Sequence, residues 1–306
     1  MTAPHEPGPD VSRGPGRLRR TTVEATRWVT PRIVRLTVRG DLEDFPDNGT
    51  DQHVALYFYP PEARVPDRLE PEALKELHEF AFPRTRRYTI REFRRLGAEA
   101  DIDLVVHQPP GPAASRGESA RVGDELLWWG PTAAWRPPEA TTDLLMIGDE
   151  TALPAIEASI RELGGALRVT VVAEVADASE EVYLADLADR ARIRWVHRGG
   201  RHADGDPSAI ESAVRALLAE DDVLGGVPAV WVGAEFATAG AMRRLFLGEH
   251  GMTKDAAFIV SYWIHGQPQD KRPDQRNRAR NLRRRAEDPQ RADRSLLPGW
   301  ESLQEV

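Results

Sequence analysis

The feature that most constrains the fold of this chain is a change in its hydrophobic pattern near residue 140. Before it, short runs rich in valine, isoleucine, threonine and aromatic residues are separated by glycine, proline and aspartate. In one run, Val34, Leu36 and Val38 alternate onto a single face. Six such runs predict a small antiparallel β-barrel, which a charged helical insertion over 64–80 interrupts. The runs are 21–28, 33–38, 52–59, 87–92, 102–107 and 125–129.

After residue 142, apolar strands alternate with amphipathic helices. This alternation predicts a parallel sheet with helices on both faces, whose ligands bind beyond the carboxyl ends of the strands. The expected strands are 144–147, 167–175, 193–196, 227–232 and 257–262, and the helices are 152–163, 209–218 and 238–247. The fold class is therefore a two-domain chain, an antiparallel β-barrel followed by an α/β nucleotide-binding domain with a parallel sheet. We expect a disordered lead (1–18), the barrel domain (19–138), the α/β domain (139–266) and a charged tail (267–306).

The amino-acid composition limits the kinds of reaction and ligand that are compatible with this chain. The chain of 306 residues has no cysteine, which excludes disulfides, cysteine-ligated clusters and cysteine nucleophiles, so a cofactor must carry electrons in any redox reaction. The net charge of −8 argues against nucleic-acid binding, and the eight histidines lack ligand spacing, so no metal site is expected. Without an apolar run of membrane-spanning length or a signal-peptide core, we expect a cytoplasmic protein. We also expect a monomer. The basic stretch 271–285 is either an anion-binding arm or a solvated helix.

The segment 86–91, Arg-Arg-Tyr-Thr-Ile-Arg, alternates basic and aromatic residues along an expected strand. A planar ligand with a phosphate tail needs a ring to pack on and a guanidinium for the phosphate, and a flavin nucleotide fits that demand. A solvent-facing basic strand is the alternative.

Four further segments lie at or after the ends of expected strands. Residues 108–115 form a loop of small residues that lets backbone N–H groups approach a phosphate, although a plain turn is equally compatible. Residues 148–156 leave a strand and enter a helix, with Thr151 as the expected N-cap. Residues 231–235 and 261–266 bring polar and aromatic groups to the sheet edge, where Trp231 and Tyr262 are also compatible with ordinary core positions.

Taken in order, these segments resemble the siderophore-interacting protein family of flavin-dependent ferric-siderophore reductases, within the ferredoxin-reductase-like superfamily. The motifs are RRYTIR, DIDLVVH with GPAAS, GDETALPAI, WVGAE and SYW, and the resemblance covers about residues 20–266. It implies FAD in the barrel domain, NAD(P)H as co-substrate, and a ferric siderophore or other ferric chelate as acceptor. Hydride then passes from the nicotinamide to the flavin, and single electrons pass to Fe(III).

The same resemblance assigns the cofactor-binding residues. Tyr88 packs on the isoalloxazine with Thr89 near its polar edge, while Thr151, Glu235 and Trp263 lie nearest the nicotinamide and the flavin. No catalytic side chain is certain, because the hydride moves between cofactors. The full set is Arg86, Tyr88, Thr89, Arg91, Asp103, His107, Gly111, Ala113, Ala114, Ser115, Thr151, Glu235 and Trp263. In this set, Arg91, Asp103 and His107 are expected to line the phosphate and adenosine side of FAD, and residues 111–115 are expected to form the loop that binds its pyrophosphate.

Two departures from the family pattern keep alternatives open. Arg116 stands where a tryptophan is expected, and Ile264 stands where a basic residue follows the closing tryptophan. The alternatives are a flavin reductase for another acceptor and a non-catalytic flavin- or siderophore-binding protein. The nicotinamide is also open, because acids over 174–177 favour NADH whereas the resemblance, with Arg198 and Arg201 as candidate phosphate contacts, favours NADPH.

Overall fold

The computed structural model describes residues 17–46, 50–60, 62–69, 71–81, 83–106, 112–132, 135–163, 165–200, 204–220 and 224–266. The chain divides into two units, 1–265 and 266–306, and of the second unit the description includes Gly266. Most of the predicted lead and all of the predicted tail lie outside the described residues. Strand β1 begins at Arg17, inside the lead predicted for 1–18.

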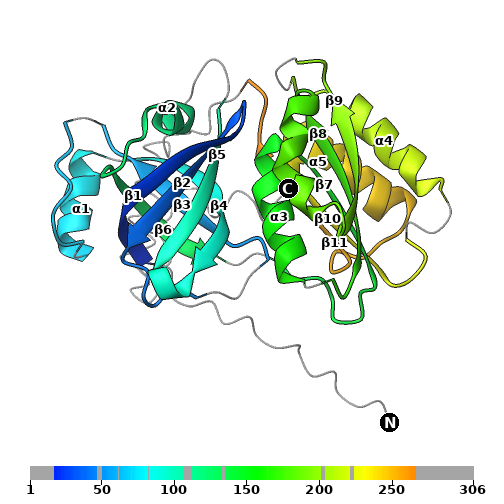
Figure 1. Cartoon of the computed structure of the whole chain (residues 1–306), viewed down its shortest axis with the longest axis horizontal. Coiled ribbons are helices and arrows are strands. Elements are labelled where there is room, and N and C mark those ends of the chain that lie inside the picture. Colours follow the sequence, from blue (N-terminus) through cyan, green and yellow to red (C-terminus); the bar gives the residue numbers. More distant parts are fainter. Residues whose placement is uncertain are drawn as a thin grey trace, which may run out of the picture. The chain divides into compact units, whose positions relative to one another are not determined.

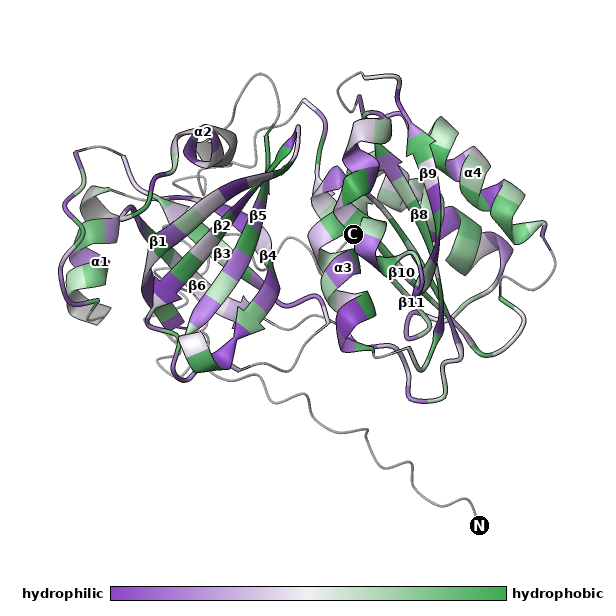
Figure 2. Ribbon diagram, viewed as in Figure 1, coloured by the Kyte–Doolittle hydropathy of each residue, from purple (hydrophilic) through white to green (hydrophobic). Residues whose placement is uncertain are grey.

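The first part of the chain is a closed antiparallel barrel of six strands in the order β1-β2-β5-β4-β3-β6, which confirms the predicted barrel (Figure 1). Val34, Leu36 and Val38 of β2 alternate into its core. Figure 2 shows how polar and apolar residues are distributed along the barrel strands. Two helices, α1 (Pro71–Phe80) and α2 (Pro112–Ser119), lie in its connections. The strands are β1 (Arg17–Thr30), β2 (Ile33–Gly40), β3 (His53–Phe58), β4 (Arg84–Arg94), β5 (Glu99–Val105) and β6 (Glu125–Thr132).

The second part is a five-stranded parallel sheet in the order β11-β10-β7-β8-β9, which confirms the predicted α/β architecture. The chain starts at the central strand β7, adds β8 and β9 on one side, and then crosses to β10 and β11 on the other. This reversal places a switch point between β7 and β10, where sheets of this kind bind ligands. The strands are β7 (Asp143–Asp149), β8 (Arg168–Val175), β9 (Ala191–His197), β10 (Pro228–Glu235) and β11 (Ala257–Trp263).

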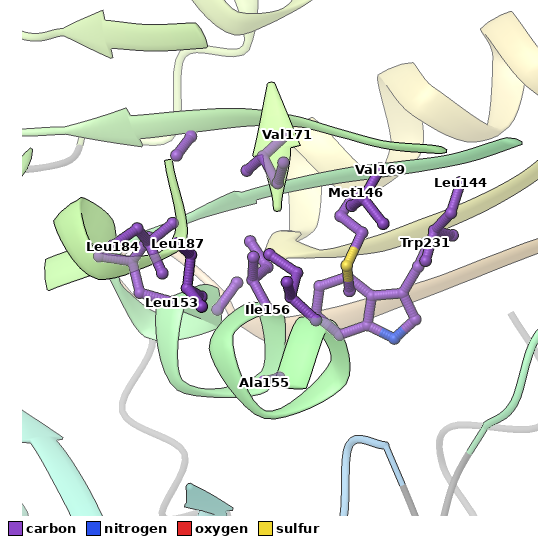
Figure 3. Close-up of a cluster of buried hydrophobic side chains, with 14 of the residues drawn as sticks. Leu144, Met146, Leu153, Ala155, Ile156, Val169, Val171, Leu184, Leu187 and Trp231 are labelled. Carbon is purple, nitrogen blue, oxygen red and sulfur yellow. The ribbon is translucent and has the colours of Figure 1, made fainter. Parts of the chain in front are cut away.

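Helices cover both faces of the sheet (Figure 1). On one face, α3 (Leu153–Glu162) and the 3₁₀ segment η3 (Ala178–Leu187) pack on β7, β8 and Trp231, as drawn in Figure 3. The predicted stripe of α3 lies in this core: Leu153, Ile156, Ile160 and Leu163. On the other face, α4 (Ser208–Leu218) and α5 (Phe236–Arg243) form a second apolar core.

Three local predictions differ from the structure. The insertion becomes helical at Pro71 rather than at residue 64, because proline suits the first turn of a helix and Pro66 disfavours an earlier start. The predicted helix 238–247 begins earlier, as α5, and continues as the π-helical turn Arg244–Glu249. The segment η3 has no counterpart among the predicted elements.

Candidate functional site

The carboxyl ends of β7, β8, β10 and β11 surround a small pocket at the switch point. Asp149, the last residue of β7, organises it. One carboxylate oxygen accepts hydrogen bonds from the backbone and hydroxyl of Thr151, and the other accepts from the Glu235 backbone N–H at 3.1 Å and the Trp263 indole N–H at 2.9 Å. A single carboxylate therefore ties together three strand ends. The pocket is lined by Asp149, Glu174, Gly205, Asp206, Ile210, Ala234, Glu235, Thr238 and Trp263.

This arrangement brings together three predicted site residues, Thr151, Glu235 and Trp263. Thr151 is not the N-cap that the sequence suggested. Asp149 is the N-cap of the short 3₁₀ turn Glu150–Ala152 that precedes α3. Its backbone is extended, and its carboxylate is a better hydrogen-bond acceptor than the Thr151 hydroxyl, which donates to it. Glu235 caps α5 in the same way through the Ala237 N–H, and its other oxygen accepts the His265 N–H at 3.0 Å.

A buried arginine joins two more acids at this edge. Arg198 donates to Glu150 and, at 3.3 Å, to Glu174. Burial raises the pKa of Glu174 to about 7, although Arg198 opposes the shift, and burial likewise raises the pKa of Glu150. Arg198 is thus engaged inside the protein, and Arg201, the other predicted phosphate contact, lies outside the described residues.

Glu174 is expected to make the protein less stable as the pH rises. Its pKa in the folded protein is about 7 against 4.5 for an unperturbed glutamate, so the folded state holds the proton more tightly. Stability attributable to this group is therefore lost between about pH 4.5 and pH 7, and linkage gives a loss of about 3 kcal/mol.

The comparison that isolates this effect is chemical denaturation of wild type and Glu174→Gln at pH 5 and pH 8. The variant should be the more stable at pH 8 and about equal at pH 5. Glu249→Gln, at an exposed glutamate paired with Arg215, is the matched control and should leave the pH dependence as in wild type. Parallel pH profiles for wild type and Glu174→Gln would contradict the assignment.

The predicted flavin strand, β4, lies beside this edge. Tyr88 is half-buried against the barrel core, and burial raises the pKa of its hydroxyl. Thr89 is buried and hydrogen-bonds with Tyr262, the residue before Trp263. This hydrogen bond connects the barrel strand to the last strand of the sheet. Arg86 donates to the Thr85 carbonyl at 2.8 Å.

A buried aspartate makes a second connection at the same place. Asp51, just before β3, accepts the Trp135 backbone N–H at 3.0 Å and the Trp231 indole N–H at 3.3 Å. Trp231 in turn meets Tyr262 edge to face, with 6.1 Å between ring centroids. Gly233 is required here because a Cβ would lie 2.5 Å from the Trp231 ring. Both aromatic residues are thus packed and hydrogen-bonded where barrel and sheet meet.

The structure places Arg91 and Asp103 in a different cluster. Arg91 pairs with Glu157 of α3. Asp103, whose side chain is 0% exposed, binds Arg35 through two 2.7 Å hydrogen bonds and also accepts the Tyr183 hydroxyl. These charges are paired within the protein, in a cluster that joins barrel and sheet, and the predicted cofactor contacts of both residues stay predictions.

Several remaining predictions concern residues about whose side chains nothing is described. His107 and Gly111 lie outside the described residues, and Ala113, Ala114 and Ser115 belong to α2 through their backbone alone. The helix packs tightly on the barrel, since a Cβ on Gly117 would lie 2.7 Å from Val34. Arg116 folds back onto the start of β6, donating to the Glu125 carbonyl at 2.9 Å, and Ile264 is exposed.

Sequence reasoning did not assign Asp149, Asp51 or Tyr262 to the site. A signal existed for Asp149, which ends a strand two residues before Thr151 at a strand-to-helix turn, the position of an N-cap. For Tyr262 no local signal distinguishes a core tyrosine from one that reaches across to another domain.

Comparison with known proteins agrees with this architecture. Residues 22–135 match the model of the siderophore-interacting FAD-binding domain, and residues 141–266 match the model of the siderophore-interacting protein. None of the helices in the described ranges has the length and apolar character needed to cross a membrane.

Individual relatives align with most of the chain. A siderophore utilization protein from T. fusca has a solved structure that is 31% identical, with a TM-score of 0.69, covering 84% of this chain and 96% of its own. Ferric vibriobactin reductase of Vibrio cholerae is 26% identical over 251 residues, 80% of this chain and 88% of its own length. The NADPH-dependent ferric-chelate reductase of Escherichia coli is 27% identical over 260 residues, 83% and 96% respectively.

These matches cover both domains in the order in which the structure has them, a barrel of the FAD-binding type followed by a parallel sheet, as in the ferredoxin-reductase-like fold. The chain belongs to the siderophore-interacting protein family.

Proposed function

We propose that this protein is an NAD(P)H-dependent, FAD-containing reductase that releases iron from ferric siderophores. The observation that carries the proposal is that the barrel is joined to the sheet beside the strand bearing the flavin motif: Asp51, just before β3, accepts the Trp231 indole N–H at 3.3 Å, and β3 pairs with β4. Two relatives that align over at least four-fifths of this chain are named as a ferric vibriobactin reductase and an NADPH-dependent ferric-chelate reductase, which supports the same activity.

The residues present fit FAD. Strand β4 offers a guanidinium in Arg86, an aromatic ring in Tyr88 and a hydroxyl in Thr89, the three kinds of group that a flavin nucleotide needs. Helix α2 begins at Pro112, inside the predicted phosphate loop 111–115, and the start of a helix is suited to bind phosphate. Arg86 and the start of α2 would hold the phosphates, and Tyr88 would support the ring.

When bound, FAD accepts two electrons as hydride from NAD(P)H and passes them on singly. Each NAD(P)H is oxidised to NAD(P)⁺, two Fe(III) ions are reduced to Fe(II), and one proton is released. The protein orients the groups: Asp149 fixes Trp263 and the start of α5, and Asp51 fixes Trp231. Fe(II) binds hard oxygen ligands less tightly than Fe(III), so reduction releases the metal from the siderophore.

The test is the visible absorption spectrum of the purified protein, recorded before and after anaerobic NADPH or NADH. We expect a flavin spectrum that bleaches with one nicotinamide or both, and recovers when a ferric chelate is added together with a ferrous indicator. Bleaching without ferrous product would favour another acceptor. Protein that neither contains nor takes up FAD would overturn the proposal.

A further inference from the structure

Charged residues gather at the carboxyl ends of β8 and β9, two adjacent parallel strands of the sheet. Strand β8 is the second strand of the sheet in chain order and follows its first βα unit. In nucleotide-binding sheets, the ribose of adenosine lies at the end of this second strand. A carboxylate there accepts the 2′-hydroxyl of NADH, whereas an arginine there binds the 2′-phosphate of NADPH. The charges at this edge therefore bear on the choice between the two dinucleotides.

The arginine that follows β9 is committed to the interior of the protein. Arg198 donates its backbone N–H to the Val175 carbonyl at 3.0 Å, which fixes it beside the end of β8. Its side chain is 7% exposed and donates to the buried carboxylates of Glu150 and Glu174. A 2′-phosphate would recruit this guanidinium only by leaving two buried acids without their partner, which is costly. The fold therefore withholds Arg198 from NADPH.

A partly exposed carboxylate, that of Asp177, lies two residues beyond the end of β8. Ser179 donates to it through its backbone N–H at 2.9 Å and through its hydroxyl at 2.5 Å, and both hydrogen bonds end on Oδ1. These bonds lower the pKa of Asp177, so its carboxylate is ionised at neutral pH. The second oxygen, Oδ2, accepts no hydrogen bond from the residues that the structure describes, which leaves it available to a ribose hydroxyl.

The loop after β9 leaves space beside this oxygen. The Gly200 N–H binds the Ala176 carbonyl at 2.8 Å, which holds the loop against the turn that contains Asp177. A Cβ on Gly200 would lie 3.9 Å from Asp177 Oδ2, in contact with it. The glycine therefore keeps side-chain atoms away from the oxygen at this position.

Two basic side chains near Asp177 already have partners within the protein. Arg32, from the turn between β1 and β2, donates to the Gly200 carbonyl at 2.8 Å. His197, the last residue of β9, hydrogen-bonds with Glu181 at 2.9 Å. Both lie close enough to Asp177 to favour its ionised form. In the described part of the chain, this edge thus presents an oxygen acceptor to a hydroxyl group and a like charge to a phosphate.

We infer that Asp177 makes this protein select NADH over NADPH, because its carboxylate accepts the 2′-hydroxyl of the adenosine ribose and repels a 2′-phosphate. The inference rests on the proposed function. It separates this chain from the Escherichia coli relative, whose name specifies NADPH. Asp177 determines specificity here and takes no part in the transfer of hydride.

The experiment measures binding separately from turnover. NAD⁺ and NADP⁺, which cannot reduce the flavin, are titrated into the FAD-loaded protein by isothermal titration calorimetry. We expect NAD⁺ to bind about tenfold or more tightly than NADP⁺. Asp177→Asn keeps an oxygen that can cap the 3₁₀ segment η3 but loses the charge, so it should reduce this ratio about fivefold or more, mainly through tighter binding of NADP⁺. Asp186→Asn, at an exposed aspartate of η3 that pairs with Arg161, is the matched control and should keep the wild-type ratio.

Ionic strength supplies a second readout. Salt screens the repulsion between Asp177 and a 2′-phosphate, so the preference of wild type for NAD⁺ should fall as salt is added, and that of Asp177→Asn should change less. Equal affinities in wild type, tighter binding of NADP⁺, or a wild-type ratio in Asp177→Asn would each overturn the inference.

Failure of the proposed function has a different signature. In that case NAD⁺ binds preferentially and depends on Asp177, but NADH does not bleach the flavin or no ferric chelate is reduced. Wild type that binds neither dinucleotide would overturn both.

Discussion

Replacing Asp103 with alanine is expected to destabilise the folded protein by about 3 kcal/mol, as in other proteins where one partner of a buried ion pair is removed. The Asp103 side chain is fully buried, and its loss leaves the Arg35 guanidinium and the Tyr183 hydroxyl without their acceptor. Glu157, 3.6 Å from Arg35, offsets part of the loss, which places the expected value at the low end of such effects. The measurement is urea denaturation at neutral pH.

The same strand supplies the control for this prediction. Glu99, at the other end of β5, pairs with the exposed Arg39, and Glu99→Gln should cost no more than about 1 kcal/mol. Asp103→Asn keeps the shape of the side chain but not its charge, so it should fall between the two. If Asp103→Ala were as stable as Glu99→Gln, the buried cluster would contribute no more than a surface ion pair.

Trp231→Ala is expected to produce the other large loss of stability, about 3–5 kcal/mol. The indole is completely buried between the sheet and α3, so its removal leaves a large cavity in the core drawn in Figure 3. It also removes the N–H that Asp51 accepts and the edge-to-face partner of Tyr262.

Trp231→Phe separates these contributions. Phenylalanine fills much of the cavity and lacks the N–H donor, so a loss of about 1–2 kcal/mol is expected. Because Tyr262 hydrogen-bonds with Thr89, both variants should be compared for FAD affinity as well as for unfolding. Wild-type stability in Trp231→Ala would contradict the packing described here.

The architecture was accessible from the sequence because each domain follows one strong pattern. Alternation in residues such as Val34 and Leu36 predicts a half-buried barrel strand, and the stripe from Leu153 to Leu163 predicts a helix with one buried face. The start of α1 was not predicted correctly although Pro66 and Pro71 mark it, and the segment η3 was missed because no periodic hydrophobic pattern marks it.

The site was less accessible, because its geometry depends on contacts between distant segments. Strand-end residues such as Glu235 and Trp263 follow from topology, since parallel strands share one carboxyl edge. The partners of Asp103 do not, because Arg35 and Tyr183 are 68 and 80 residues away in the chain. Local sequence also does not reveal that Asp149 holds three strand ends through one carboxylate.

The apolar core beneath α3 includes two residues from the barrel half of the chain, Ile33 and Trp135. A chimera that joins the barrel of this protein to the sheet of a relative at residue 138 would therefore combine two unmatched halves of one core. Expressed alone, either half would expose to water the apolar surface that Ile33 and Trp135 share with this core. Exchange of nicotinamide- or acceptor-binding modules between members of the family should thus succeed when Ile33, Trp135 and the residues they touch are transferred together as a single block.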